Sequence, residues 1–221
     1  MNKVRRALLA HFAIAPLSCQ VSSTLAQTID APKSNAVTPF RSVDVPEDGK
    51  RIFVFFDFSC PFCAKYHPNI SSWARTVPPG LKVILVPVVN PSDKIRLQEQ
   101  AIAARCYYTA ASMISGSQLT GFTQSVYDSV ARGSSLTSQS IWLSACGSAR
   151  IDPKEFARRI AGNDQATAIR YSSQKVIEYK LKSTPSIAIG GRYVLTPDDV
   201  HGDESMFFNI LNGLTSRVVT T

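Results

Sequence analysis

Cys60 and Cys63 stand three residues apart in the stretch FSCPFC, directly after the apolar run IFVFFD at residues 52–57. A thiolate is the nucleophile in disulfide exchange, but a cysteine with the ordinary pKa of about 8.5 is only slightly ionised at neutral pH. The N-terminus of a helix stabilises such an anion, because its free N–H groups and its dipole favour negative charge. Pro61 suits the first turn of a helix, where its missing N–H costs no hydrogen bond. The motif therefore predicts a redox-active pair, with Cys60 opening a helix and Cys63 one turn further on the same side.

Two other uses of this cysteine pair are open on the residues alone. A zinc ion needs two more ligands at tight spacing, and the remaining candidates are isolated from one another: Cys106, Cys146, His67 and His201. A passive structural disulfide would close a loop too small to stabilise the chain much. Redox chemistry is therefore the favoured interpretation, and no metal or other cofactor is expected.

The N-terminal residues have the pattern of a secretory signal peptide. A basic start precedes an apolar run over residues 7–17, and small residues up to Ala26 follow it. This order predicts a signal peptide over residues 1–26 and hence export, with the periplasm as the expected location. A lipoprotein cut before Cys19 and a retained membrane anchor are the alternatives.

The charge balance of the exported chain does not favour a nucleic-acid partner. Three of the 24 Lys and Arg residues lie in the predicted signal peptide, which holds no acidic residue, so export lowers the formal net charge of +8. The remaining sequence has no dense basic run of the kind that tracks phosphates. With 44% hydrophobic residues in 221, the chain can bury one sizeable core. We therefore expect a mildly basic globular protein that does not bind nucleic acid.

The elements around the motif have strand and helix patterns in a definite order. Residues 40–45 predict a short edge strand, and the continuous apolar run at 51–58 predicts a strand that is buried on both faces. Residues 60–75 predict the helix that begins with the motif. Residues 81–89 predict a second buried strand, in which Pro87 indicates that the end leaves the hydrogen-bond ladder.

Residues 91–162 lack strand patterns and predict an all-helical insertion. Apolar residues recur there at helical spacing in two stripes: Ile95, Ile102, Cys106, Ala110 and Met113, then Phe122, Val126 and Val130. Residues 163–182 predict an amphipathic helix. Its expected inward residues are Ala166, Ile169, Ser173, Val176, Ile177 and Leu181. Two strands joined by Gly190 and Gly191 then predict a hairpin, and a last helix is expected to begin near Asp203.

These patterns indicate a mixed α/β domain with a helical interruption. The expected organisation is a signal peptide (1–26), a flexible lead-in (27–38), a first α/β part (39–90), the helical insertion (91–162) and a second α/β part (163–221).

FSCPFC after a buried strand, together with the segment TPS at 184–186 before the hairpin, resembles a DsbA-like thiol:disulfide oxidoreductase of the thioredoxin superfamily. The resemblance covers residues 40–218, nearly the whole exported chain. It implies the α/β thioredoxin fold, a central mixed sheet flanked by helices, here with an all-helical insertion. It also implies that Cys60 is the exposed nucleophile, that Cys63 is the resolving cysteine and that Pro185 is a cis proline beside the sulfurs.

Four residues are candidates for tuning the redox properties of these sulfurs: Pro61, Phe62, Thr184 and His67. Phe62 stands where strong oxidases of the family have histidine, and it cannot donate a hydrogen bond to the thiolate. Thr184 resembles the isomerase branch. His67 is in place to assist proton transfer, although we expect it to be half-exposed and to have no role in the reaction. Asp57 is expected to be a solvated carboxylate at the strand end, and Val54 stands where relatives carry a buried acid.

Cys106 and Cys146 fall inward on the predicted insertion helices. Some DsbA-like proteins have a second disulfide in this region, so the resemblance implies a structural bond between them. Two separately buried thiols are the alternative, because free cysteine is common in protein cores.

The resulting functional hypothesis is a monomeric, exported dithiol oxidase that donates disulfides to cysteine-containing exported proteins. The resemblance implies reoxidation by a DsbB-like quinone reductase in the membrane. A reductase or isomerase of the same fold is the first alternative, and a redox-inactive binding module is the second. Phe58 and Phe62 are candidates for binding unfolded peptide, and packing in the core is the alternative for Phe58.

Overall fold

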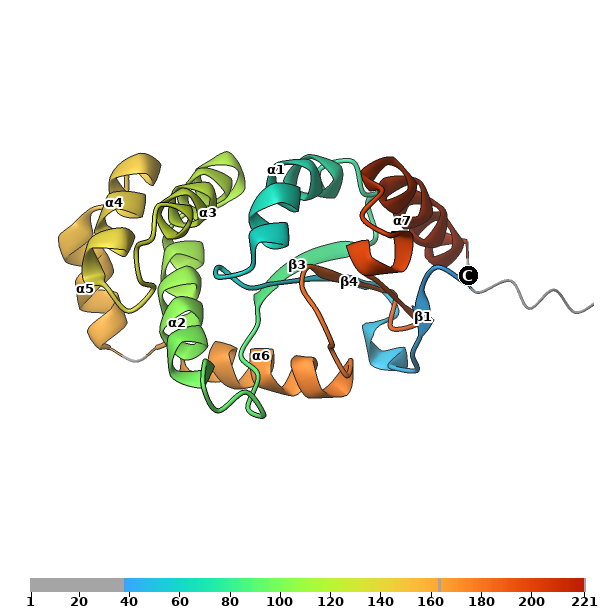
Figure 1. The fold of residues 1–221 in the computed structure, drawn as a ribbon, viewed down its shortest axis with the longest axis horizontal. Coiled ribbons are helices and arrows are strands. Elements are labelled where there is room, and N and C mark those ends of the chain that lie inside the picture. The colour runs from blue at the N-terminus through green and yellow to red at the C-terminus, as the bar shows by residue number, and fades with distance from the viewer. Residues whose placement is uncertain (1–37, 163, 221) are drawn as a thin grey trace, which may run out of the picture. The chain divides into compact units, whose positions relative to one another are not determined.

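The computed structural model describes residues 38–162 and 164–220, and a five-stranded sheet lies at its centre (Figure 1). The strands are β1 (Arg41–Ser42), β2 (Arg51–Phe56), β3 (Lys82–Pro87), β4 (Ser186–Ile189) and β5 (Tyr193–Leu195). Their order is β1-β5-β4-β2-β3, in which β2 and β3 are parallel and all other neighbours are antiparallel. The predicted central mixed sheet is confirmed, with an edge strand β1 of only two residues. The predicted signal peptide lies outside the described residues.

Strand β2 is apolar without interruption because helices cover both of its faces. Ile52 and Val54 pack with residues of α1 (Pro61–Ala74) and α7 (Glu204–Val219). Phe53 and Phe55 point to the opposite face and pack against α6 (Ala166–Glu178). Figure 1 shows α1 and α7 on one side of the sheet and α6 on the other. Because β2 also has β4 and β3 as neighbours, its C-terminal end, where the cysteine motif begins, lies in the interior of the sheet and not at its edge.

Strand β3 differs from the prediction of a fully buried strand. It lies at the edge of the sheet, and of its six residues one is exposed, three are half-buried and two are buried. Pro87 is tolerated there, because Val88 donates its N–H to Phe56 and the nitrogen of Pro87 therefore faces away from β2.

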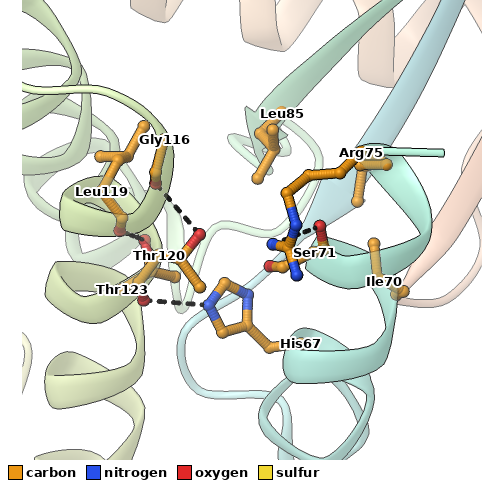
Figure 2. A pocket seen from close by; sticks show the side chains of 11 residues that line it. His67, Ile70, Ser71, Arg75, Leu85, Gly116, Leu119, Thr120 and Thr123 are labelled. Atoms are coloured by element: carbon orange, nitrogen blue, oxygen red, sulfur yellow. Dashed lines mark hydrogen bonds between the residues drawn. The ribbon is translucent and has the colours of Figure 1, made fainter. Parts of the chain in front are cut away.

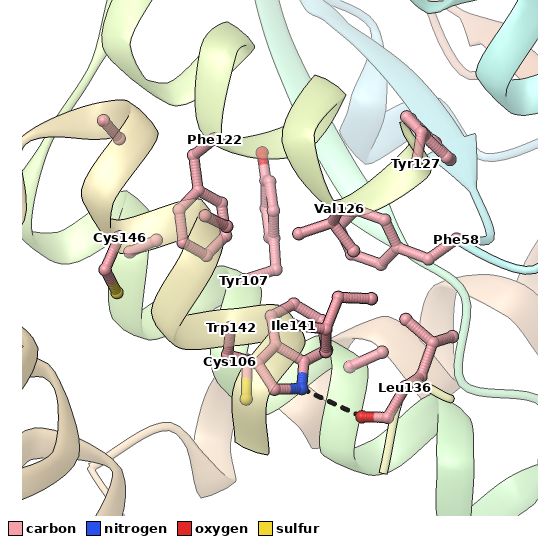
Figure 3. Close-up of a cluster of buried hydrophobic side chains, with 14 of the residues drawn as sticks. Phe58, Cys106, Tyr107, Phe122, Val126, Tyr127, Leu136, Ile141, Trp142 and Cys146 are labelled. Atoms are coloured by element: carbon pink, nitrogen blue, oxygen red, sulfur yellow. Dashed lines mark hydrogen bonds between the residues drawn. The ribbon is translucent and has the colours of Figure 1, made fainter. Parts of the chain in front are cut away.

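Four helices between β3 and α6 form the predicted insertion: α2 (Leu97–Met113), α3 (Gly116–Ala131), α4 (Gln139–Ala149) and α5 (Pro153–Ala161). They share a core in which Phe122, Trp142 and Phe156 are buried. Figure 3 shows Phe122 and Trp142 within this core. The prediction that Ile95 belongs to the buried stripe is wrong. Ile95 is 94% exposed, because the chain is still in a turn there and α2 begins only at Leu97.

The inward face of α6 also differs from the prediction at Ile177, which is 60% exposed. Lys175, two positions earlier, is buried, and its ammonium pairs with the buried carboxylate of Asp48. Asp48 also accepts hydrogen bonds from Arg51 and from the Tyr179 hydroxyl, each at 2.9 Å. The buried face of α6 therefore includes a charged side chain, which hydrophobic periodicity does not indicate.

The predicted hairpin and last helix are confirmed. Gly190 and Gly191 form the turn with φ of 58° and 65°, a region that favours glycine. A side chain at Gly191 would also place its Cβ 1.9 Å from the carbonyl oxygen of Val45. Asp203 caps α7 by accepting a hydrogen bond from the N–H of Met206 at 2.9 Å. Within the described ranges, no helix is long and apolar enough to cross a membrane.

Candidate active site

Cys60 lies at the N-cap of α1, as the sequence predicts. Strand β2 ends at Phe56, and a turn closed by the hydrogen bond from the Cys60 N–H to the Asp57 carbonyl leads into the helix. Cys60 itself is extended, and Pro61 occupies the first helical turn. The side chain of Cys60 is partly exposed, whereas Cys63 is 2% exposed. One sulfur of the pair can therefore meet a partner thiol while the other is held inside.

The two cysteines differ strongly in acidity. A hydrogen bond with the Cys63 side chain has the largest influence on the pKa of Cys60. Together with hydrogen bonds from the Thr184 side chain and from the N–H groups of Cys63 and Phe62, it lowers the pKa of Cys60 to about 6 against the opposing effect of burial. Burial, followed by the proximity of Cys60, raises the pKa of Cys63 well above its ordinary value. Cys60 is therefore the thiolate at neutral pH and Cys63 is the thiol.

The loop before β4 completes the surroundings of Cys60. The peptide bond between Thr184 and Pro185 is cis, in agreement with the expectation for Pro185. In its thiol form Cys60 donates to the Thr184 carbonyl oxygen at 3.1 Å. The structure thus brings the cysteine pair next to Thr184 and Pro185, although Cys60 and Thr184 are 124 positions apart in the sequence.

Asp57 is not the solvated carboxylate that was expected, since it is 6% exposed. Its carboxylate accepts hydrogen bonds from the Ser59 N–H and hydroxyl at 2.9 and 2.7 Å. Gln100 on α2 donates to it at 3.2 Å, and Arg96 forms an ion pair with it at 3.2 Å. The start of the insertion therefore covers Asp57, which fixes the turn before Cys60. Neither Arg96 nor Gln100 was identified from the sequence, because nothing local links them to the motif.

The two phenylalanines beside the motif have different roles in the structure. Phe58 is 2% exposed and its ring packs against Tyr127 and Trp142, with centroids 5.2 and 5.7 Å away. Core packing is thus confirmed for Phe58, and the interpretation of this residue as a peptide contact is wrong. Phe62 is 52% exposed, so its ring is available at the surface next to Cys60.

His67 is also not the half-exposed bystander that was expected. It is 7% exposed and makes a hydrogen bond with the Thr120 carbonyl oxygen on α3 at 3.2 Å. Burial lowers the pKa of His67, although the bond to Thr120 opposes this effect. The active-site helix therefore carries a buried imidazole one turn after Cys63.

All four cysteines in the described part of the chain are free thiols. Cys106 and Cys146 are both buried in the insertion core (Figure 3). Burial is the largest cause that raises their pKa values, to about 12 and about 11. The disulfide between Cys106 and Cys146 stays a prediction. Among the described residues, no group of three or more His, Cys, Asp and Glu side chains could hold a metal ion.

Comparison with known proteins gives a consistent result. A family model described as thioredoxin matches residues 46–205. The thiol:disulfide interchange protein DsbA of Bordetella pertussis is 25% identical over 179 residues, covering 78% of this chain and 81% of the relative.

Solved structures have the same architecture. DsbA of Pseudomonas aeruginosa superposes with a TM-score of 0.67 at 14% identity, covering 81% of this chain and 91% of that one. The oxidoreductase DsbA from Xylella fastidiosa gives a TM-score of 0.65 at 18% identity, covering 82% and 96%. The predicted thioredoxin fold with a helical insertion is thereby confirmed.

Proposed function

The chain belongs to the thioredoxin family and is a DsbA-like thiol:disulfide oxidoreductase, and from this premise we propose that it acts as a dithiol oxidase on exported proteins. The observation that carries the direction of the reaction is the unequal acidity of Cys60 and Cys63. Whatever stabilises the reduced pair makes its disulfide easier to reduce and hence more oxidising. A stabilised Cys60 thiolate therefore favours donation of the disulfide.

The reaction takes two exchange steps. A substrate thiolate attacks the sulfur of Cys60, the Cys60–Cys63 bond breaks, and Cys63 leaves as a thiolate that takes up a proton. A second substrate thiolate then attacks the substrate sulfur of the mixed disulfide, and Cys60 leaves. Because the pKa of Cys60 is about 6, Cys60 is a good leaving group. The substrate loses two electrons and gains a disulfide, and the enzyme is left as a dithiol.

The proposed substrates, redox partner and cellular location are based on the family and on the sequence. The substrates are cysteine-containing exported proteins, and the partner that restores the disulfide is a DsbB-like membrane protein. The predicted signal peptide at 1–26 directs the chain to the periplasm. Phe62, with its ring exposed beside Cys60, is the candidate contact for unfolded substrate.

Equilibration of the protein with glutathione buffers tests the direction of the reaction. We expect a reduction potential between those of thioredoxin, about −270 mV, and the strongest DsbA oxidants, about −120 mV. A potential at or below that of thioredoxin would instead identify a reductase. As a matched variant, Phe62→His adds a hydrogen-bond donor beside Cys60 and should raise the potential, by about 30 mV for each 1.4 kcal/mol of added thiolate stabilisation. Failure both to oxidise a reduced two-cysteine peptide and to reduce an oxidised one would exclude both activities.

A further inference from the structure

Two adjoining cavities lie behind the active-site helix, and His67 lines both. The smaller one, of about 10 Å³, is also lined by Cys63, Tyr127 and Pro185. The larger one, of about 180 Å³, lies between α1 and α3, with Arg75 among its lining residues (Figure 2). The residues common to both cavities are Val54, His67, Ile70, Leu85 and Thr123. Of these, His67 has the one side chain that titrates near neutral pH.

The hydrogen bond of His67 determines which ring nitrogen is free. A carbonyl oxygen only accepts hydrogen bonds, so Nε2 carries the hydrogen and donates it to Thr120. Nδ1 then holds the lone pair of the neutral ring, and it has no hydrogen-bond partner among the described residues. Figure 2 shows the ring between α1 and α3, with one nitrogen toward α3 and the other on the opposite edge of the ring. His67 thus presents a basic nitrogen in an otherwise mainly apolar space.

Cys63 needs a proton carrier in both directions of the reaction. When the disulfide opens, Cys63 leaves as a thiolate and is protonated, because its buried thiol form is strongly favoured. When the disulfide forms again, Cys63 loses that proton before its sulfur attacks Cys60. The sulfur belongs to a residue that is 2% exposed, so direct exchange with bulk solvent is restricted. His67 follows Cys63 by four residues on α1, a spacing that puts both side chains on one face of the helix.

We propose that His67 carries the proton between Cys63 and solvent, with one water molecule in the smaller cavity as the bridge and the larger cavity as the exit. This inference rests on the proposed function. A space of about 10–15 Å³ is the least that holds a water molecule, and the smaller cavity is at that limit. In disulfide formation the thiol proton of Cys63 passes through the water to Nδ1, and the imidazolium then releases it toward the larger cavity. In disulfide opening the proton moves the opposite way.

No other lining residue can take this role. Besides His67, the titratable or charged groups that line the two cavities are Cys63 on α1, Arg75 directly after α1, and Tyr127 on α3. The guanidinium of Arg75 keeps its charge at all accessible pH values. Burial raises the pKa of Tyr127 well above its ordinary value, so its phenol stays protonated. Strands β2 and β3 and the Pro185 loop contribute only apolar side chains to the two linings.

Excess oxidised glutathione converts the reduced protein to a mixed disulfide at Cys60. The attack of Cys63 on Cys60, which closes the Cys60–Cys63 disulfide, is then a separate step whose rate can be measured. In the wild type the first-order closing rate should be nearly constant between about pH 7 and 8, because His67 is already neutral there. In His67→Ala the rate should fall about 10- to 100-fold and rise about tenfold with each pH unit, as hydroxide becomes the base. Added imidazole should restore the rate of His67→Ala and leave the wild type unchanged.

Two further variants separate proton transfer from packing. His67→Gln can still donate to the Thr120 carbonyl but cannot accept a proton, so it should share the pH profile of His67→Ala. Thr123→Val changes a residue of the same two cavities with little change in volume, so it should keep the wild-type rate and profile. Alkylation of the Cys60 thiolate by iodoacetamide should be equally fast in all of these proteins.

The possible failures are distinguishable. A wild-type pH profile in His67→Gln, with normal exchange by the wild type, would overturn the relay and leave the oxidase intact. The absence of any thiol exchange by the wild type would refute the proposed function and the relay with it. The same loss of rate in Thr123→Val would assign the effect to packing and overturn the relay.

Discussion

Cys63→Ala is expected to accumulate stable mixed disulfides with cysteine-containing proteins, whereas Cys60→Ala traps almost none and loses exchange activity altogether. The exposed, acidic Cys60 still reacts in the first variant, but no second sulfur is present to release the partner. In the second variant the remaining thiol is 2% exposed and its pKa is raised well above the ordinary value, so it neither meets a substrate nor ionises.

Non-reducing electrophoresis and mass spectrometry of protein exposed to an oxidised peptide check this expectation. The double variant Cys60→Ala, Cys63→Ala is the background control, because it retains the buried Cys106 and Cys146. Equal trapping by the two single variants would contradict the assignment of Cys60 as the attacking sulfur. Trapping by the double variant would show that another cysteine reacts.

Asp48→Asn is expected to lower the free energy of unfolding at neutral pH by about 3 to 5 kcal/mol, because it removes the fully buried partner of the Lys175 ammonium and leaves Glu178 as its remaining charged partner. The Asp48 carboxylate is fully buried and accepts hydrogen bonds from Lys175, Arg51 and Tyr179. Burial alone would raise the pKa of Asp48, but these three hydrogen bonds outweigh it and lower the pKa. The network therefore favours the ionised carboxylate in the folded state.

The sign of the pH dependence follows from this lowered pKa. The folded pKa of Asp48 lies below the ordinary value of 3.8, so its contribution is fully present above about pH 5 and is lost as the pH falls through the folded pKa. The stability difference between the wild type and Asp48→Asn should therefore be largest near neutral pH and shrink in acid.

Urea unfolding at several pH values measures both effects. Glu155→Gln is the matched control, since it removes a carboxylate that pairs only with the partly exposed Arg158 and Arg159 and should change the midpoint little. A destabilisation of Asp48→Asn no larger than that of Glu155→Gln would contradict the account of the buried network.

The elements that the sequence predicts well are those whose causes are local. The apolar run of β2, the proline after Cys60, the glycine pair of the hairpin and the capping carboxylate of Asp203 each act within a few residues. Their physical requirements are therefore visible in short stretches of sequence. The resemblance then added the cis bond at Pro185, which local patterns do not determine.

The residues that were misread depend on partners far along the chain. Asp57 looks like a solvated strand-end residue until Gln100, 43 positions later, covers it. Lys175 was not among the expected inward residues of this helix, but it pairs with Asp48, 127 positions earlier, and is buried. His67 is buried because α3 of the insertion packs over α1, and a single histidine on a helix carries no signal of that contact. Only the folded arrangement of the whole domain reveals these three environments.

Titration of the Cys60 thiolate by its ultraviolet absorbance is the measurement that tests the central claim most directly. Because the pKa values of Cys63, Cys106 and Cys146 are raised, the first thiolate to form belongs to Cys60, and Cys60→Ala should lack that step. We predict an apparent pKa of about 6, which leaves Cys60 largely ionised at neutral pH. A first step near the ordinary value of about 8.5 would contradict the claim that this fold stabilises the Cys60 thiolate and makes its disulfide oxidising.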